Sequence, residues 1–485
     1  MTEKATSENA AELAILLHKA VTQMQAQQID AAILSFEEIV RLQPDFADGW
    51  FNLGYLYRCD RRFIEATQAY GKALELNVDR PEEVHLNRAV IFIDHLDRYT
   101  DAQLELERAL EINPTFALAW INLGQLYEDL GRPIPAREAY LAALDLAPHN
   151  GRAHARLSAI DIFERRTEEA VERLKSVLSM PGILAEDRAE MMFALGAAMD
   201  ALGRYDDALP VFQAANQLVW STIPLAARYN PSRASAQVHA LKNAFTEPKM
   251  SRRSDDLRKN PIFICGLFRS GSTLTEHILS SHSQVVSGGE LETIPFFVQK
   301  YLQPYPEILS SFAESEWTKL SDIYYRELAH LHLECRAVTD KRPDNFWHIG
   351  LIKLIFPNAR IIHTTRNLND VALSIYSTGF DKSVSYSFRM ADIMDNIGNY
   401  RNIMSHWQSI YPHDIYTLEY ERLIAAPKKE IEQMLEFCGL NWEDACLDDA
   451  ARSGQVRTAS NWQIRAPLHR KSAGRWKNYR RLFSN

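Results

Sequence analysis

The 485 residues are 46% apolar and 24% charged, which is average for soluble globular proteins and excludes a fibrous or largely disordered chain. Roughly two to four domains are expected at this length. The net charge of -9 at pH 7 gives no global reason to expect nucleic acid as a partner. The five cysteines lack CxxC or Cys/His spacing, so neither a structural zinc site nor a disulfide framework is predicted.

The amino terminus has no features of a targeting segment. Residues 1–17 lack a basic stretch followed by an apolar run. Nowhere in the chain do about 18 apolar residues follow one another, as a membrane-spanning helix would need. We therefore expect a cytoplasmic protein without a membrane span.

Residues 1–218 contain an internal repeat. An alanine followed four residues later by a bulky apolar residue recurs at a nearly constant interval. The pairs are Ala32/Phe36, Ala66/Tyr70, Ala102/Leu106, Ala136/Tyr140, Ala170/Leu174 and Ala208/Phe212. A period of roughly 34 residues indicates a solenoid in which each unit buries its apolar face against its neighbours.

A second pattern precedes two of these pairs. It occurs as Trp50-x2-Leu53-Gly54-x2-Tyr57 and again as Trp120-x2-Leu123-Gly124-x2-Tyr127. Together the two patterns resemble the tetratricopeptide repeat, in about six copies over residues 1–218. The resemblance implies an all-α array with a groove for a peptide or protein, while the aromatic residues of the pattern are expected to pack in its core.

The sequence changes character after residue 218. Residues 219–259 are predicted to be a connector, because the repeat fades and the stretch 251–260 is polar and rich in basic residues. Beyond it, apolar runs at 261–266, 360–364 and 414–418 predict strands, and the periodicity of 273–281, 370–376 and 428–437 predicts helices. Alternating strands and helices indicate an α/β domain with a parallel sheet, here assigned to residues 260–485.

The turn between the first predicted strand and helix is Gly266-Leu-Phe-Arg-Ser-Gly-Ser-Thr273. It has the two-glycine spacing of a phosphate-binding loop, but Ser272 stands where a Walker A loop has lysine. Backbone N–H groups at a helix N-terminus still favour an anion, and Arg269, Ser272 and Thr273 add donors. The missing lysine disfavours an ATP-dependent kinase.

Five segments in the second half resemble those of sulfotransferases, most closely the protein-tyrosine sulfotransferases. They are Arg269-Ser-Gly-Ser-Thr273 with Glu290, Asp340-Lys341-Arg342-Pro343, Arg366 with Ser374 eight residues later, Tyr420-Glu-Arg-Leu, and Thr458-Ala-Ser460. The resemblance spans residues 260–481 and implies a P-loop-type sulfotransferase fold. It departs from the family pattern at Phe268, Arg342 and Thr378.

The resemblance implies the donor and the residues that bind it. The donor is 3′-phosphoadenosine 5′-phosphosulfate, the product is adenosine 3′,5′-bisphosphate, and no metal is expected. The residues implied to contact the donor are Arg269, Ser270, Gly271, Ser272 and Thr273 of the loop, Arg366 and Ser374 at the 3′-phosphate, and Tyr420 and Arg475 elsewhere on the nucleotide. Arg269, Lys341 and Ser460 are the residues implied to stabilise the departing phosphate oxygen.

Glu290 is the implied general base, and Glu292 is its local alternative. The resemblance favours a protein tyrosine as acceptor, recruited by the repeats, and a carbohydrate or small-molecule alcohol is the alternative. A non-catalytic scaffold that binds a nucleotide also remains open. Residues 451–485 carry nine Lys or Arg and no Asp or Glu, a basic tail suited to an anionic donor.

Overall fold

The computed structural model describes residues 2–248, 260–331, 335–448 and 473–483. Its contacts divide the chain into two compact units. Unit 1 comprises Met1–Glu128 and Arg132–Pro148, and unit 2 comprises Asp129–Gly131 and His149–Asn485. Within the described residues, no helix combines the length and apolarity needed to cross a bilayer.

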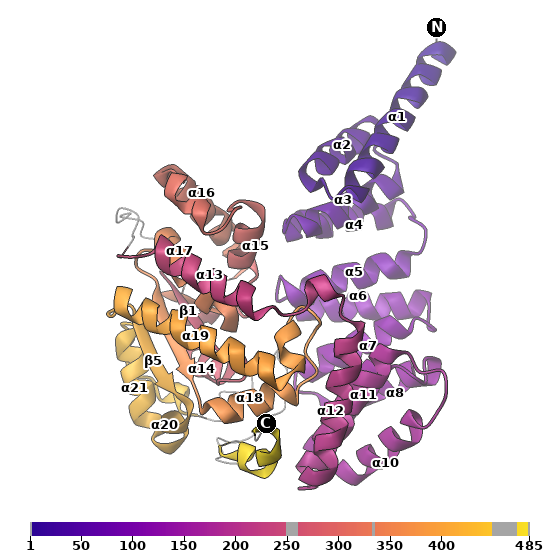
Figure 1. Cartoon of the computed structure of the whole chain (residues 1–485). Coiled ribbons are helices and arrows are strands. Elements are labelled where there is room, and N and C mark those ends of the chain that lie inside the picture. Colours follow the sequence, from indigo (N-terminus) through magenta and orange to yellow (C-terminus); the bar gives the residue numbers. More distant parts are fainter. Residues whose placement is uncertain (1, 249–259, 332–334, 449–472, 484–485) are drawn as a thin grey trace. The chain divides into compact units, whose positions relative to one another are not determined.

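The repeat region consists of helix pairs, as the alanine spacing predicted (Figure 1). The helices are α1 (Thr2–Gln25), α2 (Ile29–Leu42), α3 (Ala47–Cys59), α4 (Phe63–Glu75), α5 (Pro81–Asp94), α6 (Tyr99–Ile112), α7 (Ala117–Asp129), α8 (Pro133–Leu146), α9 (Gly151–Phe163), α10 (Thr167–Leu178), α11 (Ala185–Ala201) and α12 (Tyr205–Thr222). Each repeated alanine lies on the second helix of its pair and is fully buried. The fold class predicted for this half is confirmed.

The glycine of the repeat pattern allows the two helices of a pair to approach closely. A Cβ atom on Gly54 would lie 2.8 Å from the ring of Tyr70, and one on Gly124 would lie 2.7 Å from the ring of Tyr140. The tryptophan of the pattern has a structural role as well, because its indole N–H donates to the carbonyl of Pro44, at 2.9 Å from Trp50 Nε1. The pattern therefore encodes packing within the array.

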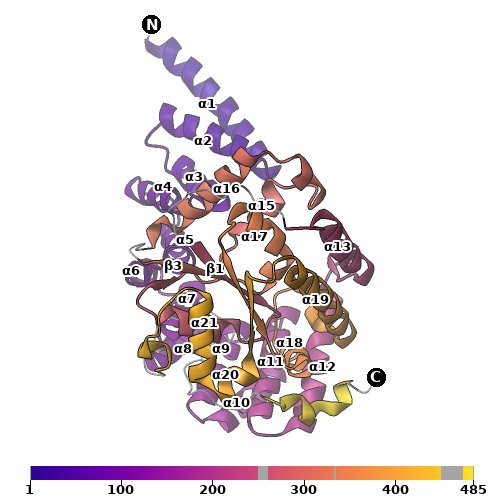
Figure 2. The ribbon, with the colours of Figure 1, turned by 90° about the vertical axis from the view of Figure 1, so that its left-hand side faces the viewer.

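The last two helix pairs belong to unit 2 and share one apolar core with the C-terminal domain. The amide of Asn216 on α12 donates to the carbonyl of Tyr376 at 2.9 Å. Residues 219–259, predicted to be a connector, include helix α13 (Pro231–Ala244). Helix α13 lies along α19 (Met390–Ile410) in both ribbon views, and Phe245 packs edge-on against Trp407 just beyond its end (Figures 1 and 2).

The C-terminal domain contains a five-stranded sheet in which every pairing is parallel. The strands are β1 (Asn260–Gly266), β2 (Val285–Ser287), β3 (Ala337–Lys341), β4 (Arg360–Thr365) and β5 (Ile415–Glu419), in the order β2-β3-β1-β4-β5. The predicted strands β1, β4 and β5 are confirmed, whereas β2 and β3 were not predicted. The order reverses direction at β1, and such a switch point is where open α/β sheets bind ligands.

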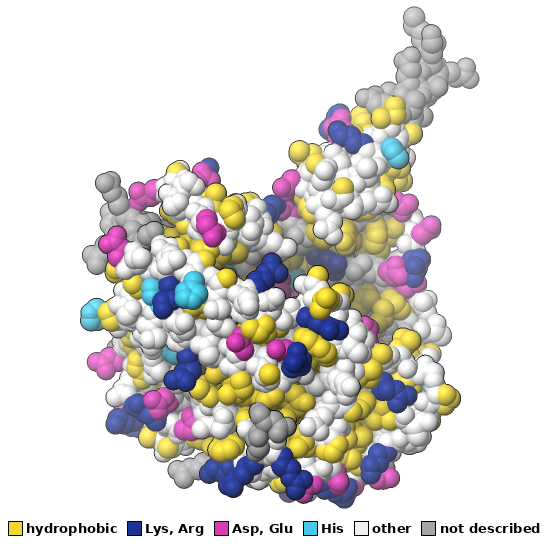
Figure 3. Space-filling model, in the orientation of Figure 1, with side chains coloured by type: hydrophobic (Ala, Val, Ile, Leu, Met, Phe, Trp, Pro, Cys, Tyr) yellow, Lys and Arg dark blue, Asp and Glu magenta, His cyan; other side chains and the backbone are white. Residues whose placement is uncertain are grey.

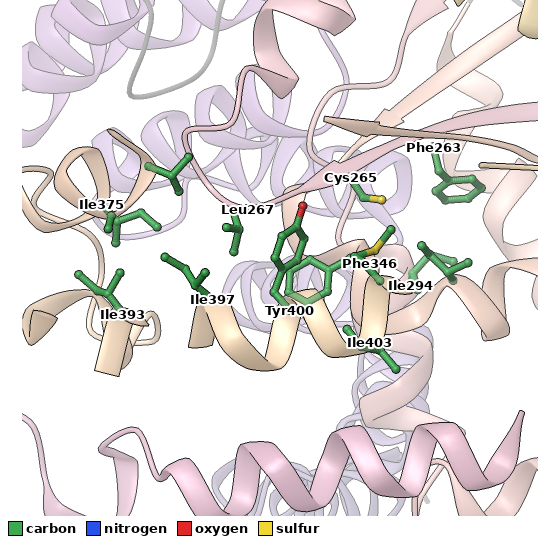
Figure 4. Packing of buried hydrophobic residues seen from close by; sticks show 14 of the residues in the cluster. Phe263, Cys265, Leu267, Ile294, Phe346, Ile375, Ile393, Ile397, Tyr400 and Ile403 are labelled. Atoms are coloured by element: carbon green, nitrogen blue, oxygen red, sulfur yellow. The ribbon is translucent and has the colours of Figure 1, made fainter. Parts of the chain in front are cut away.

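Alternate residues of the strands enter two different cores. Phe263 and Cys265 of β1 face the core that contains Tyr400 and Ile403 of α19 (Figure 4). Among the described residues, the other α-helices of this domain are α14 (Ser272–Ser280), α15 (Thr293–Lys300), α16 (Glu314–Glu327), α17 (Ile349–Ile355), α18 (Leu368–Tyr376), α20 (Tyr420–Ala425) and α21 (Pro427–Phe437), and the 3₁₀ segment η9 spans Arg475–Phe483. Ile264 of β1 faces the other core, with helices α14, α20 and α21. Helices on both faces cover the parallel sheet, as predicted.

Candidate active site

The sequence motifs meet at one edge of the sheet because all five strands run in the same direction. The carboxyl end of β1 leads into the loop 267–271, and that of β2 leads into residues 288–292. Strand β3 ends at Lys341, β4 ends just before Arg366, and β5 ends just before Tyr420. The parallel topology thus gathers segments that are far apart in the chain.

The loop after β1 is locked in a shape that exposes backbone N–H groups at the start of α14. Arg269 and Gly271 both have positive φ angles, 70° and 106°. The Ser270 hydroxyl donates to the carbonyl of Leu267 at 2.7 Å and shares a second hydrogen bond of 2.7 Å with the hydroxyl of Thr364 on β4. Ser270 therefore holds the loop against the sheet with its side chain.

Three arginines gather at this loop. Arg269 Nε donates to Ser374 Oγ of α18 at 3.0 Å, and Arg366 Nη1 donates to the backbone carbonyl of Arg269 at 3.3 Å. Burial, and then the guanidinium groups of Arg366 and Arg475, lower the pKa of Arg269 to about 10. Cations that destabilise one another in this way favour an anionic ligand, and arginine binds phosphate and sulfate in bidentate fashion.

Tyr420, the first residue of α20, completes this cluster. The Arg366 guanidinium lies 4.8 Å from the centre of the Tyr420 ring, a cation–π contact. The same ring limits the loop, because a Cβ atom on Gly271 would lie 3.0 Å from it. Arg475, at the start of η9, is placed by an ion pair with Asp200 of α11 at 3.0 Å.

A second cluster surrounds Lys341, the last residue of strand β3. Its side chain is only 1% exposed. The ammonium contacts the carboxylate of Glu290 and lies 4.0 Å from that of Glu276 on α14. Lys341 lies beside Glu290 because the backbone pairing between β3 and the chain after β2 continues beyond the end of β2. In this pairing Lys341 N donates to Gly289 O at 2.8 Å.

Glu276 holds the segment that precedes Glu290. Its buried carboxylate accepts hydrogen bonds from Ser287 Oγ at 3.0 Å, Gly289 N at 3.1 Å and Thr339 Oγ1 at 2.9 Å. Burial raises the pKa of Glu276, although Lys341 and the hydroxyl donors oppose the shift. The carboxylate therefore fixes the backbone on which Glu290 stands.

The two candidate bases contact different cations. Glu290 is 44% exposed and meets Lys341, whereas Glu292 is 62% exposed and lies 3.9 Å from Arg342. Arg342 pairs more closely with Asp344, at 2.7 Å. The departure from the family pattern at Arg342 thus creates a separate ion pair beside the Lys341 cluster.

The structure also locates most of the other residues that the sequence singled out. Ser272 and Thr273 form the first turn of α14, with Ser272 buried. Ser460 lies outside the described residues. Of the other departures, Phe268 packs on Phe380 with ring centres 5.3 Å apart, and the Thr378 hydroxyl donates to the carbonyl of Ser374 at 2.8 Å.

Sequence reasoning missed three acidic residues that organise the site. They are Glu276, Asp200, and Asp370, whose carboxylate accepts from the backbone N–H groups on both sides of Arg475. A weak signal existed for Glu276, a carboxylate that stands between the apolar residues Leu274 and Ile278 of a predicted helix. Asp200 gave no signal, since it lies far before its partner Arg475 in the chain.

The fold and this edge define an α/β domain with a phosphate-type loop and a cluster of arginines, preceded in the chain by a helical repeat array. Residues 261–444 match the family model described as Sulfotransferase family, and residues 84–219 and 17–81 match two models of tetratricopeptide repeats. Residues 261–444 therefore contain a sulfotransferase-family domain, and residues 17–81 and 84–219 contain tetratricopeptide repeats.

Relatives with matching sequences agree with this assignment. An uncharacterized protein of Aquifex aeolicus is 34% identical over 335 residues, which cover 66% of this chain and 44% of the relative. Protein-tyrosine sulfotransferase A of Caenorhabditis elegans is 25% identical over 244 residues, covering 44% of this chain and 59% of the relative. The protein-tyrosine sulfotransferase of Drosophila melanogaster is 25% identical over 240 residues, covering 44% of each chain. The chain thus spans less than two thirds of each relative.

Solved structures also resemble parts of the chain. The sulfotransferase domain of the Synechococcus PCC 7002 olefin synthase is 22% identical, with a TM-score of 0.34, and covers 47% of this chain and 91% of that domain. The tetratricopeptide-repeat protein YrrB, described as having an unusual peptide-binding site, is 19% identical, with a TM-score of 0.33, and covers 40% of this chain and 96% of that protein.

Proposed function

We propose that this protein transfers a sulfuryl group from 3′-phosphoadenosine 5′-phosphosulfate to a hydroxyl group, and that the acceptor is a tyrosine in a protein. The observation that carries the proposal is the arginine cluster of Arg269, Arg366 and Arg475 beside a helix N-terminus, within a sulfotransferase-family domain. The two protein-tyrosine sulfotransferase relatives support the acceptor.

The donor carries anionic groups at both ends, and the cluster suits them. Arg269 and the N–H groups of the loop would bind the 5′-phosphosulfate end, while Arg366 and Ser374 would bind the 3′-phosphate. Ser374 is only 6% exposed, and its contact with Arg269 links the two predicted subsites. Charge-assisted hydrogen bonds of this kind are each worth about 1.5–3 kcal/mol.

The chemical step needs a base and a stabilised leaving group. The acceptor oxygen forms a bond to sulfur while the bond from sulfur to the bridging phosphate oxygen breaks, which releases adenosine 3′,5′-bisphosphate. Glu290 would accept the hydroxyl proton, and its partial exposure leaves it accessible to an acceptor. Lys341, held beside it, would donate to the bridging oxygen as negative charge develops there.

The repeats would bring the acceptor to this site. Tetratricopeptide arrays present an extended surface that suits a peptide in extended or helical form. Tyr55 on α3 and Leu118 on α7 are large apolar side chains on the first helices of their pairs, 39% and 53% exposed. These two side chains would contact a peptide bound along the first helices of the pairs.

One experiment tests both donor and acceptor. The purified protein is incubated with donor labelled in the sulfuryl group, together with tyrosine-containing acidic peptides or with a cell lysate. We expect label in protein, retained as tyrosine sulfate after alkaline hydrolysis. Label in glycans or small molecules would keep the sulfotransferase activity but overturn the tyrosine acceptor, and binding of the bisphosphate without any transfer would favour a non-catalytic nucleotide-binding scaffold.

A further inference from the structure

The position of Arg475 is determined by two aspartates from distant parts of the chain. The first is Asp370 of α18, which is 2% exposed. Its Oδ2 accepts from the backbone N–H of Gly474 at 2.6 Å, and its Oδ1 accepts from that of Trp476 at 2.9 Å. One buried carboxylate thus holds the backbone on both sides of Arg475, and the positive φ of Gly474 (77°) permits the turn.

The second aspartate holds the side chain. Asp200 Oδ1 accepts from Arg475 Nε at 3.1 Å and lies 3.0 Å from Nη2. The hydroxyl of Tyr479, whose ring is buried, donates to the same oxygen. Asp200 is only 16% exposed and Arg475 27% exposed, so solvent screens this ion pair less than it screens a surface pair.

Asp200 is a residue of the repeat array, near the end of α11, and α11 is fixed to the C-terminal domain. Phe193 on the same helix packs on the segment after α18, where a Cβ atom on Gly379 would lie 2.8 Å from its ring. Leu195 and Met199 enter the core that also contains Ile375 of α18. The carboxylate of Asp200 is therefore held on the same rigid core as the residues of the arginine cluster.

We propose that Asp200 is a positioning residue for the sulfuryl donor: the last tetratricopeptide repeat orients Arg475 toward the anion site that Arg269 and Arg366 form. This inference rests on the proposed function and deepens it, since the repeats become part of donor binding as well as acceptor recruitment. Lys and Arg side chains gather at the lower edge of Figure 3, where Figure 1 places the C-terminal end.

The sign of the effect separates positioning from simple electrostatics. Asp200 is negative, so its removal alone would make the site more positive and would tighten the binding of any anion. A loss of affinity in folded Asp200→Asn protein is therefore opposite in sign to the direct electrostatic effect and indicates a displaced Arg475. The lost negative charge and a displaced Arg475 change the affinity in opposite directions, so the direction in which the affinity changes is itself the test.

The experiment measures the affinity of the full-length protein for adenosine 3′,5′-bisphosphate by calorimetry. Asp200→Asn keeps the size and removes the charge, and we expect binding to weaken about 5- to 30-fold, part of the cost of one lost charge-assisted hydrogen bond. In an Arg475→Ala background the same substitution should not weaken binding any further, and the loss of the negative charge should tighten it slightly. The KM for the donor should rise, while the KM for the acceptor should stay the same.

Two further variants keep the result independent of folding. Tyr479→Phe keeps every charge and most of the packing, and it should weaken binding by about 2- to 5-fold because Asp200 loses one of its donors. Asp206→Asn is the matched control: this repeat aspartate also faces an arginine of η9, at 3.5 Å from Arg481, but is 92% exposed. The Asp206→Asn protein should bind the bisphosphate as tightly as the wild type does.

Unchanged or tighter binding in both Asp200→Asn and Tyr479→Phe would overturn the inference, and so would an equal loss in Asp206→Asn. Wild-type protein that fails to bind the bisphosphate would overturn the proposed function and this inference together. Normal wild-type binding with unaffected variants would overturn the inference alone.

Discussion

Replacing Glu290 by glutamine tests the chemistry with little change to the structure. The amide keeps the size of the side chain but cannot accept the acceptor proton, so turnover should fall by about 10²–10⁴. That loss corresponds to roughly 2.7–5.5 kcal/mol of activation free energy. Lys341 keeps Glu276 as a carboxylate neighbour at 4.0 Å, and Glu290 is nearly half exposed. Because Lys341 itself is buried and loses one of its two carboxylate neighbours, the free energy of unfolding should fall by about 1–3 kcal/mol.

The assay compares initial rates of sulfuryl transfer at saturating donor, with urea unfolding and bisphosphate binding measured in parallel. Glu292→Gln is the matched control, because this carboxylate lies two residues away, is more exposed and faces Arg342 at 3.9 Å. It should keep near-normal turnover. If Glu292→Gln abolishes turnover while Glu290→Gln does not, the register of the base is wrong by two residues. If neither variant loses activity, no carboxylate of this segment acts as the base.

Three other predictions follow from individual contacts. Arg366→Ala should lose about 1.5–3 kcal/mol of bisphosphate affinity by calorimetry, the worth of a charge-assisted hydrogen bond, and unchanged affinity would remove its phosphate role. Gly54→Ala should destabilise the protein by about 1–3 kcal/mol because the new Cβ would meet the ring of Tyr70. Gly71→Ala, whose new Cβ would enter open space, should instead stabilise the protein by about 0.5–1 kcal/mol. Equal effects of the two substitutions in urea unfolding would refute the close approach at Gly54. Burial lowers the pKa of His363 to about 4, below its unfolded value of 6.5. The stability that the neutral His363 contributes is therefore present above pH 6.5 and lost as the pH falls toward 4. The loss in free energy of unfolding is about 2 kcal/mol between pH 7 and 5, and His363→Gln should remove this part of the pH dependence.

The repeat array and three of the five strands were predictable because their signals are local. A tetratricopeptide pair repeats the same small and large residues at a fixed spacing, so Ala66 and Tyr70 indicate the contact that Gly54 makes possible. The strands β1 and β4 contain short apolar runs, and the loop after β1 has a recognisable glycine spacing. Strand β2 is only three residues long, and β3 contains Thr339, Asp340 and Lys341, so neither has the apolar run that would have revealed it.

The sequence alone therefore determined the two architectures, their order, and the segments that carry candidate site residues. The tertiary structure decided which of these residues meet and what holds them in place. Lys341 can end a buried strand because Glu276 and Glu290 neutralise it, and Arg475 can approach two other arginines because Asp200 supports it. Each of these partners comes from a distant segment of the chain. An ion pair or hydrogen bond over such a separation leaves no periodicity in the sequence, so only the folded chain reveals it.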